Sequence, residues 1–122
     1  VMGILNATPD SFFAGSRAQA EDAILAKAER MLAEGATFLD VGGYSTRPGA
    51  DEVSEAEEID RVLGAIGPIL KTFPHALISV DTFRASVAER AVTAGAGLVN
   101  DVAGGTLDPN MFATVARLGV PY

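Results

Sequence analysis

The sequence contains no cysteine, no tryptophan and a single histidine among its 122 residues. The absence of cysteine excludes disulfide bonds and thiolate metal sites, and a single histidine excludes the histidine pair common in zinc sites. Basic residues are also scarce, since 9 Lys and Arg stand against 16 Asp and Glu and give a formal net charge of −7. This acidic balance argues against a nucleic-acid partner, because nucleic acids are bound by basic surfaces.

Long hydrophobic runs are missing as well. No run approaches the ~18 residues of a membrane span, and no basic segment followed by an apolar one opens the chain. We therefore expect no membrane partner and a cytoplasmic location. Hydrophobic residues still make up 48% of the sequence, which is enough for the packed core of one compact domain. These features favour a domain that acts on small molecules.

Short apolar runs alternate with helical patterns that end in glycine. The apolar runs predict strands at 1–5, 37–41, 76–81 and 97–101, and the start of a fifth strand at 120–122. The helical patterns predict helices over 16–33, 54–70, 87–92 and 112–118. Gly67 and Pro68 are predicted to kink or break the second helix. Asp108 is predicted to be the N-cap of the last helix, with Pro109 in its first turn.

Four strand–helix alternations predict a parallel sheet. Residues 35–40 (GATFLD) and 95–100 (GAGLVN) also form an internal repeat two such units apart. A regular repeat of about 30 residues favours a (βα)8 TIM barrel over a doubly wound sheet, since eight units need about 244 residues. We therefore expect an α/β fold in which residues 1–122 form the N-terminal half of a single barrel domain. This half would hold the first four βα units and the start of strand five.

Each predicted strand delivers an amide or a carboxylate to its carboxyl end, namely Asn6, Asp40, Asp81 and the pair Asn100 and Asp101. In a barrel these ends form the active face, so the side chains should gather around one mouth. Taken singly, Asp81 or Asp101 also fits a helix cap. As a set they favour a site that accepts hydrogen bonds from a flat N–H-rich edge, such as an aminopyrimidine ring.

Two predicted loops follow the first and second strands and are candidate lids. Residues 8–15 place Phe12 and Phe13 between proline and glycine, which indicates either a substrate cover or core packing. Residues 42–50 combine hydroxyls, Arg47, proline and glycine. His75 precedes the third strand, so it should lie at the opposite end of the barrel and is given no role.

Four motifs resemble those of the dihydropteroate synthase family. Residues 2–12 (MGILNATPDSF) are similar to the family's opening signature, and residues 40–50 (DVGGYSTRPGA) to its second signature. Residues 79–82 (SVDT) and 100–101 (ND) resemble the third and fourth. The likeness covers essentially the whole chain, and it implies the same (βα)8 barrel.

The resemblance implies a transferase of folate biosynthesis. Family members join 6-hydroxymethyl-7,8-dihydropterin pyrophosphate to 4-aminobenzoate and release 7,8-dihydropteroate and pyrophosphate. The pyrophosphate leaves first, assisted by Mg²⁺, and the aniline nitrogen attacks the remaining pterin cation. The resemblance also implies a sulfonamide target and a homodimer at full length. Residues 1–122 alone are expected to be inactive, because the other half of the site is missing.

The resemblance also implies roles for individual residues. Asp81 and Asn100 would hold the pterin and stabilise its developing charge, and Asn6 would contact the pyrophosphate and its metal. The residues expected around 4-aminobenzoate are Asp10, Phe12, Ser45, Thr46, Arg47 and Pro48. The chain departs from the common family pattern at Ala14, where an acidic residue is frequent, and at Tyr44, where glutamate is frequent.

Two alternatives belong to other functional classes. One is a pterin-binding module without synthase activity, such as a half-barrel fragment or a regulatory paralogue. The other is a methyltetrahydrofolate-dependent methyltransferase, whose barrel also holds a pterin but which does no pyrophosphate chemistry. Residues 45–49 (STRPG) favour the synthase over both.

Overall fold

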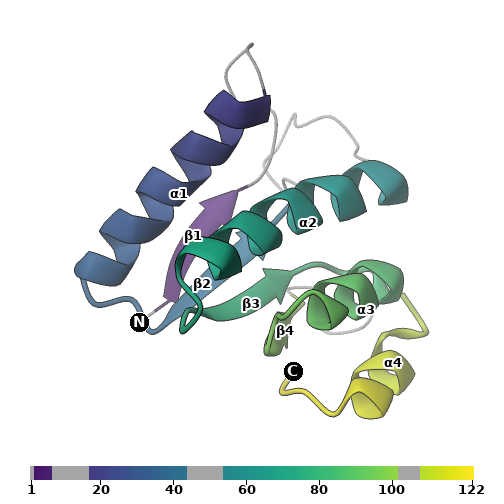
Figure 1. The fold of residues 1–122 in the computed structure, drawn as a ribbon. Coiled ribbons are helices and arrows are strands. Elements are labelled where there is room, and N and C mark those ends of the chain that lie inside the picture. Colours follow the sequence, from purple (N-terminus) through teal and green to yellow (C-terminus); the bar gives the residue numbers. More distant parts are fainter. Residues whose placement is uncertain (1, 7–16, 44–53, 102–107) are drawn as a thin grey trace, which may run out of the picture.

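The computed structural model describes residues 2–6, 17–43, 54–101 and 108–122, and strand and helix alternate along it as predicted (Figure 1). The elements in chain order are β1 (Met2–Asn6), α1 (Arg17–Ala33), β2 (Phe38–Gly42), α2 (Glu55–Thr72), β3 (Leu77–Asp81), α3 (Ala85–Thr93), β4 (Leu98–Asn100) and α4 (Met111–Leu118). No helix in this part of the chain is long and apolar enough to cross a membrane.

The four strands form one parallel sheet in the order β1-β2-β3-β4. Each strand therefore pairs with the next strand in the sequence. A doubly wound sheet reverses its direction of growth partway, whereas a (βα)8 barrel adds every strand on the same side. The strand order is that of four consecutive barrel units, which confirms the predicted fold class.

The core lies between the sheet and the helices. In Figure 1, α1, α2 and α3 lie along one face of the sheet, and each contacts the strand that precedes it. Side chains alternate between the two faces of a strand, and the helix-facing set is buried to 3% exposure or less: Leu5, Leu39, Val41, Ile78, Val80 and Val99. These side chains pack against buried residues of the helices, among them Ala28, Val62, Ile66, Ile69, Val87 and Ala91.

The other face of the sheet carries exposed apolar side chains. Met2, Ile4 and Leu77 are 39%, 58% and 51% exposed, although all three are large and hydrophobic. In a closed barrel this face points inward and is filled by side chains from every strand. The exposure follows from the presence of four strands in place of eight.

Helix α2 is continuous through Pro68, so the predicted break is wrong. Proline removes one backbone hydrogen bond and crowds the carbonyl four residues earlier. That earlier residue is Gly64, which has open space around its Cα. Ile66 and Ile69 on either side are fully buried, and their packing stabilises the helix by more than one lost hydrogen bond costs.

The predicted N-cap of the last helix is also wrong. Helix α4 begins after Asn110, whose side chain makes no capping bond. Asp108 instead accepts a hydrogen bond from the backbone N–H of Ala85 at 2.8 Å and another from that of Asn110 at 2.9 Å. Because Ala85 is the first residue of α3, the carboxylate satisfies an N–H of that helix and joins it to the start of α4.

The chain after α4 runs beside β4. Residues 120–122 are not a regular strand, but the backbone N–H of Val99 donates to the carbonyl of Pro121 at 3.0 Å. This single bond places the segment on the free edge of β4, where the fifth strand was predicted to begin. The Tyr122 hydroxyl also donates to Asp101 Oδ2 at 2.8 Å.

Candidate functional site at the carboxyl edge of the sheet

The parallel register aligns the ends of the four strands in one row. Asn6 pairs with Gly42, Gly42 with Asp81, and Asp81 with Asn100. The predicted gathering at one edge is therefore confirmed for Asp81 and Asn100 and for the backbone of Asn6. The side chain of Asn6 lies outside what the structure describes.

Asp40 lies one layer deeper than this row. It precedes the end of β2 by two residues, pairs with Ile4 and Ser79, and is only 3% exposed. It therefore does not sit on the rim with the other three. Residues two apart on a strand share a face, so Asp40 supports the row from below.

Asp40 and Asn100 are joined directly, although they lie 60 residues apart in the sequence. Asn100 Nδ2 donates to Asp40 Oδ2 at 3.2 Å. Burial raises the pKa of Asp40, and the neighbouring Ser79 hydroxyl and Asn100 amide offset part of that rise. Within the described residues, Asp40 Oδ1 and Ser79 Oγ are both buried and neither completes a hydrogen bond. The layer below the row thus retains unused hydrogen-bonding capacity.

Asp81 supplies the carboxyl group of the row, and the pKa of that group is strongly perturbed. Burial raises its pKa to about 6, and the negative charges of Asp40, Glu58 and Asp101 contribute to the same rise. Both causes act because a carboxylate loses hydration in the site and is surrounded by like charges. At neutral pH the group is still mostly ionised, so this edge of the sheet is strongly negative.

Gly42 and Gly43 make room on the two faces of β2. A Cβ at Gly42 would lie 3.3 Å from Asp81 Cβ and 3.5 Å from Asp81 Oδ2. A Cβ at Gly43 would lie 3.0 Å from the carbonyl oxygen of Glu58, on α2. The pair was predicted as part of a lid loop, but packing on both sides of the strand explains why glycine stands there.

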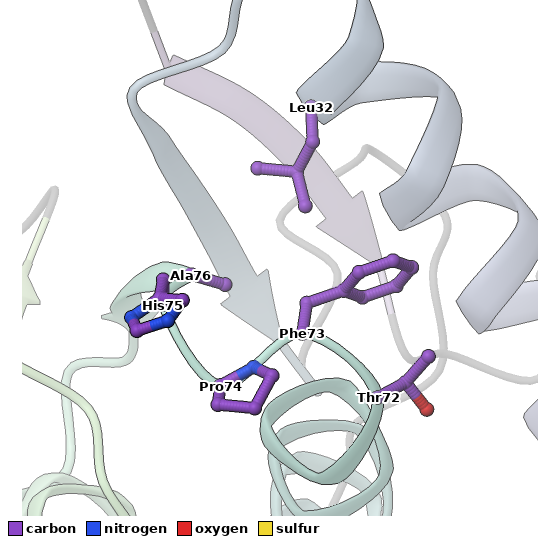
Figure 2. A pocket seen from close by; sticks show the side chains of 6 residues that line it. All are labelled: Leu32, Thr72, Phe73, Pro74, His75 and Ala76. Atoms are coloured by element: carbon purple, nitrogen blue, oxygen red, sulfur yellow. The ribbon is translucent and has the colours of Figure 1, made fainter.

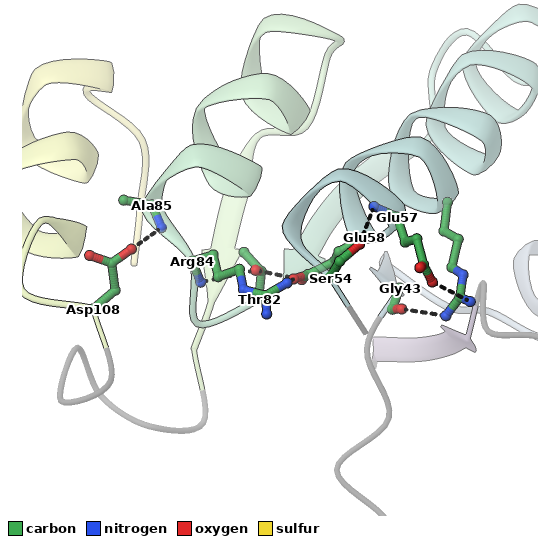
Figure 3. A network of polar contacts seen from close by, with 9 residues as sticks. Gly43, Ser54, Glu57, Glu58, Thr82, Arg84, Ala85 and Asp108 are labelled. Atoms are coloured by element: carbon green, nitrogen blue, oxygen red, sulfur yellow. Dashed lines mark hydrogen bonds and ion pairs between the residues drawn. The ribbon is translucent and has the colours of Figure 1, made fainter. Parts of the chain in front are cut away.

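Sequence reasoning missed a polar network beside Asp81, which is formed by Glu58, Thr82 and Arg84 (Figure 3). Glu58 is fully buried, and burial raises its pKa despite its hydrogen bond from Thr82 and the charge of Arg84. A signal was present in the sequence: Glu58 occupies the same helical stripe as Val62 and Ala65, which are buried in α2. A carboxylate at a core position of an amphipathic helix indicates a specific partner.

Several predicted site residues lie outside the described residues, so their placement stays a prediction: Asp10, Phe12, Ser45, Thr46, Arg47 and Pro48. Across 2–6, 17–43, 54–101 and 108–122, no group of three or more His, Cys, Asp or Glu side chains is arranged to hold a metal ion. The expected Mg²⁺ is therefore left without a described ligand set in this chain.

A cavity of about 370 Å³ lies at the amino end of the sheet (Figure 2). It is lined by Leu32, Thr72, Phe73, Pro74, His75 and Ala76. Leu32 lies in the last turn of α1, Thr72 is the last residue of α2, and the other four residues lie between α2 and β3. The cavity is therefore at the end of the strands opposite Asp81 and Asn100. His75 is exposed there, at the end of the sheet that the sequence predicted.

The fold defines a barrel-type α/β protein, and the polar strand ends at the carboxyl edge of its sheet are a candidate ligand site. Residues 2–122 match the family model described as pterin binding enzyme. The chain belongs to the pterin binding enzyme family.

Relatives and solved structures agree with this assignment. Over 121 residues the chain is 50% identical to a dihydropteroate synthase of Bacillus subtilis, covering 99% of this chain and 42% of that protein. It is 55% identical to a folic acid synthesis protein of Pneumocystis carinii, covering 99% of this chain and 16% of that protein. The structure of a Clostridium difficile dihydropteroate synthase, determined in the presence of pteroic acid, matches with a TM-score of 0.90 and 42% identity.

A second solved structure is that of the Xanthomonas albilineans dihydropteroate synthase with 4-aminobenzoic acid, which matches with a TM-score of 0.88 and 44% identity. The match covers 98% of this chain in both structures, but 45% of the Clostridium chain and 43% of the Xanthomonas chain. The chain thus spans less than half the length of these relatives.

The surroundings of Asp81 predict how it titrates. In the full-length protein, ¹³C NMR of the Asp81 carboxyl should show a midpoint near pH 6, well above the ordinary 3.8. Asp40→Asn should move that midpoint to lower pH, because it removes a neighbouring negative charge. Asp22→Asn, which changes an exposed residue of α1, should leave it in place. A midpoint that ignores Asp40→Asn would contradict the electrostatic coupling.

The raised pKa of Asp81 also makes the free energy of unfolding depend on pH. The folded protein holds the Asp81 proton up to about pH 6, whereas the unfolded chain releases it near 3.8. The folded state therefore binds more protons in this window, and the contribution of Asp81 to the free energy of unfolding falls as the pH rises through it.

Proposed function

We propose that the full-length protein containing this chain is a dihydropteroate synthase. It would join 6-hydroxymethyl-7,8-dihydropterin pyrophosphate to 4-aminobenzoate and release 7,8-dihydropteroate and pyrophosphate, a step of folate biosynthesis. The observation that carries the proposal is the alignment of Asp81 and Asn100 above Asp40 at one edge of the sheet. The similarity to dihydropteroate synthases of Bacillus, Clostridium and Xanthomonas supports it.

The two side chains of the row complement the polar edge of a pterin. The Asp81 carboxylate accepts hydrogen bonds from the ring N–H and the exocyclic amino group of the pterin. Asn100 uses its Nδ2 to donate to Asp40, so the amide presents its Oδ1 as a further acceptor. The contact with Asp40 thereby sets the orientation in which Asn100 meets the substrate.

The charge of the site favours the reaction as well as binding. When pyrophosphate leaves, the pterin becomes positively charged, and the ionised carboxylates of this edge attract the new charge. Asp81 is the closest of them to the proposed ring position, and Asp40 and Asp101 add to the negative potential around it. One such preorganised interaction is worth about 3 kcal/mol in related cases.

The remaining parts of the proposal rest on the side chain of Asn6 and on residues outside the described ones. The 4-aminobenzoate would be bound by the two loops that contain Asp10, Phe12, Ser45, Thr46, Arg47 and Pro48, and a sulfonamide would compete with it there. Asn6 would supply one amide oxygen toward Mg²⁺ on the pyrophosphate. One amide does not hold Mg²⁺ alone, because this ion takes an octahedral set of ligands. We further propose a homodimer at full length.

The experiment that tests this function is measurement of pyrophosphate release by the full-length protein with both substrates. A synthase predicts one pyrophosphate per dihydropteroate formed. It also predicts much slower steady-state release when 4-aminobenzoate is omitted, because the pterin cation can then react only with water. Tight pterin binding without pyrophosphate release would contradict it and favour a non-catalytic module. Methyl transfer from methyltetrahydrofolate would favour the methyltransferase. Residues 1–122 alone should be inactive in the same assay, because the inner face of their sheet stays open.

Asp81→Asn should distinguish charge stabilisation from simple binding. In the full-length enzyme this change keeps the shape of the side chain and removes its charge. We expect kcat to fall by about 10²- to 10³-fold, with a smaller loss of pterin affinity measured by calorimetry. Asp22→Asn on the exposed surface of α1 is the matched control and should keep both values. A loss confined to affinity would mean that Asp81 only holds the ring.

A further inference from the structure

Glu58 is an unusual residue for the interior of a helix-covered sheet. It lies in α2, it is 0% exposed, and its two carboxylate oxygens have different partners. Thr82 Oγ1 donates to Oε2 at 2.7 Å, and Arg84 Nη1 donates to Oε1 at 3.0 Å. Figure 3 shows these contacts bridging from the first turns of α2 to the segment that leads into α3.

Thr82 connects this buried carboxylate to both residues of the proposed pterin site. It follows Asp81 directly in the sequence, and its backbone N–H donates to the carbonyl of Asn100 at 3.1 Å. Its hydroxyl also accepts a hydrogen bond from the backbone N–H of Arg84 at 3.1 Å. One residue therefore ties the end of β3 to the end of β4, and Glu58 holds that residue from α2.

Stability alone does not explain a buried carboxylate at this position. A buried ion pair loses much of its Coulombic gain to desolvation, and an apolar pair of similar volume is often as stable. The network does fix geometry, because each of its hydrogen bonds restrains the turn between Asp81 and α3. A displacement of about 1 Å in a reacting group can cost a hundredfold in rate.

We propose that Glu58 is a positioning residue that acts through Thr82 to hold Asp81 and Asn100 in the geometry needed for reaction of the pterin. This inference rests on the proposed function, since it assigns those two residues to the pterin. Glu58 itself touches neither of them through a described hydrogen bond. Its role would be to position the two groups and to set the charge around Asp81.

The proposal can be tested through the pKa of Asp81, because three charged groups face this residue. They are Asp40 from β2, Glu58 from α2 and Asp101 from the segment after β4, and all three raise the pKa of Asp81. Arg84 lies against Glu58 with 17% of its side chain exposed. Glu58→Gln removes one of these negative charges, which should lower the pKa of Asp81.

The first arm of the test needs no catalysis. In the full-length protein, ¹³C NMR should place the titration midpoint of Asp81 at lower pH in Glu58→Gln than in the wild type. Glu57→Gln is the matched control, because Glu57 is the neighbouring residue on α2, is 60% exposed and pairs with Arg61 on the surface. The control should titrate like the wild type. Equal midpoints in the two variants would overturn the electrostatic part of the proposal.

The second arm uses the hydroxyl of Thr82. Thr82→Val removes its hydrogen bonds to Glu58 and from Arg84 and keeps the shape of the side chain. We expect kcat to fall roughly 10- to 100-fold with little change in KM for the pterin substrate, and Thr82→Ser to restore it to within about threefold. Equal losses in the two variants would overturn the positioning role. If Thr82→Val does not fold, Thr82→Ser measured against Glu58→Gln decides the same point, since only the serine variant should stay within about threefold of the wild-type kcat.

The two arms also separate this inference from the function on which it rests. A wild-type protein that releases no pyrophosphate would contradict the synthase proposal. The titration arm would then still decide whether Glu58 controls the charge at Asp81. A wild-type protein that is active, combined with variants that match their controls in both arms, would contradict only the role of Glu58.

Discussion

The parallel register of the sheet is the constraint on which the site depends. Asp81 and Asn100 come from separate βα units, yet pairing of the strands places them side by side at one edge. A shift of one residue would turn each of these side chains to the helix-covered face and bring apolar neighbours to the edge. The register is fixed by Val41, Val80 and their neighbours, which are buried against the helices. The hydrophobic core therefore determines where these polar side chains are located.

The same edge carries groups that do not stabilise the fold. Asp40, Glu58 and Asp81 all have raised pKa values, chiefly because each is buried. Keeping them ionised costs free energy that a neutral core would not require. Polar groups retained at such a cost are expected where a cationic or N–H-rich ligand is bound. The opposite end of the sheet instead carries a mainly apolar cavity and an exposed histidine.

Much of the fold could be predicted from the sequence, because the apolar runs and glycine punctuation are strong local signals. The strand order followed from the 60-residue repeat and from barrel topology. The continuous α2 could not be predicted, because the effect of Pro68 is overridden by burial of Ile66 and Ile69 in three dimensions. The role of Asp108 was missed for a related reason, since the helix that it caps begins 23 residues earlier in the chain.

The site was predictable to a similar extent. The predicted strand ends located Asp81 and Asn100. The depth of Asp40 was missed, because it depends on how β2 pairs with β1 and β3, which are distant in the sequence. The hydrogen bond between Glu58 and Thr82 joins residues 24 apart in the sequence. The only sequence signal for it was a carboxylate, Glu58, at a position of α2 where the helical pattern places buried residues. The two glycines after Val41 fit a loop equally well until the packing of Asp81 and α2 against them is known.

The most direct test of this account is a crystal structure of the full-length protein with 6-hydroxymethylpterin bound. We expect the pterin at the carboxyl edge of the sheet, with Asp81 and Asn100 within about 3 Å of its ring N–H and amino groups and Asp40 beneath Asn100. A pterin bound elsewhere, or an Asp81 carboxylate turned away from it, would contradict the central claim.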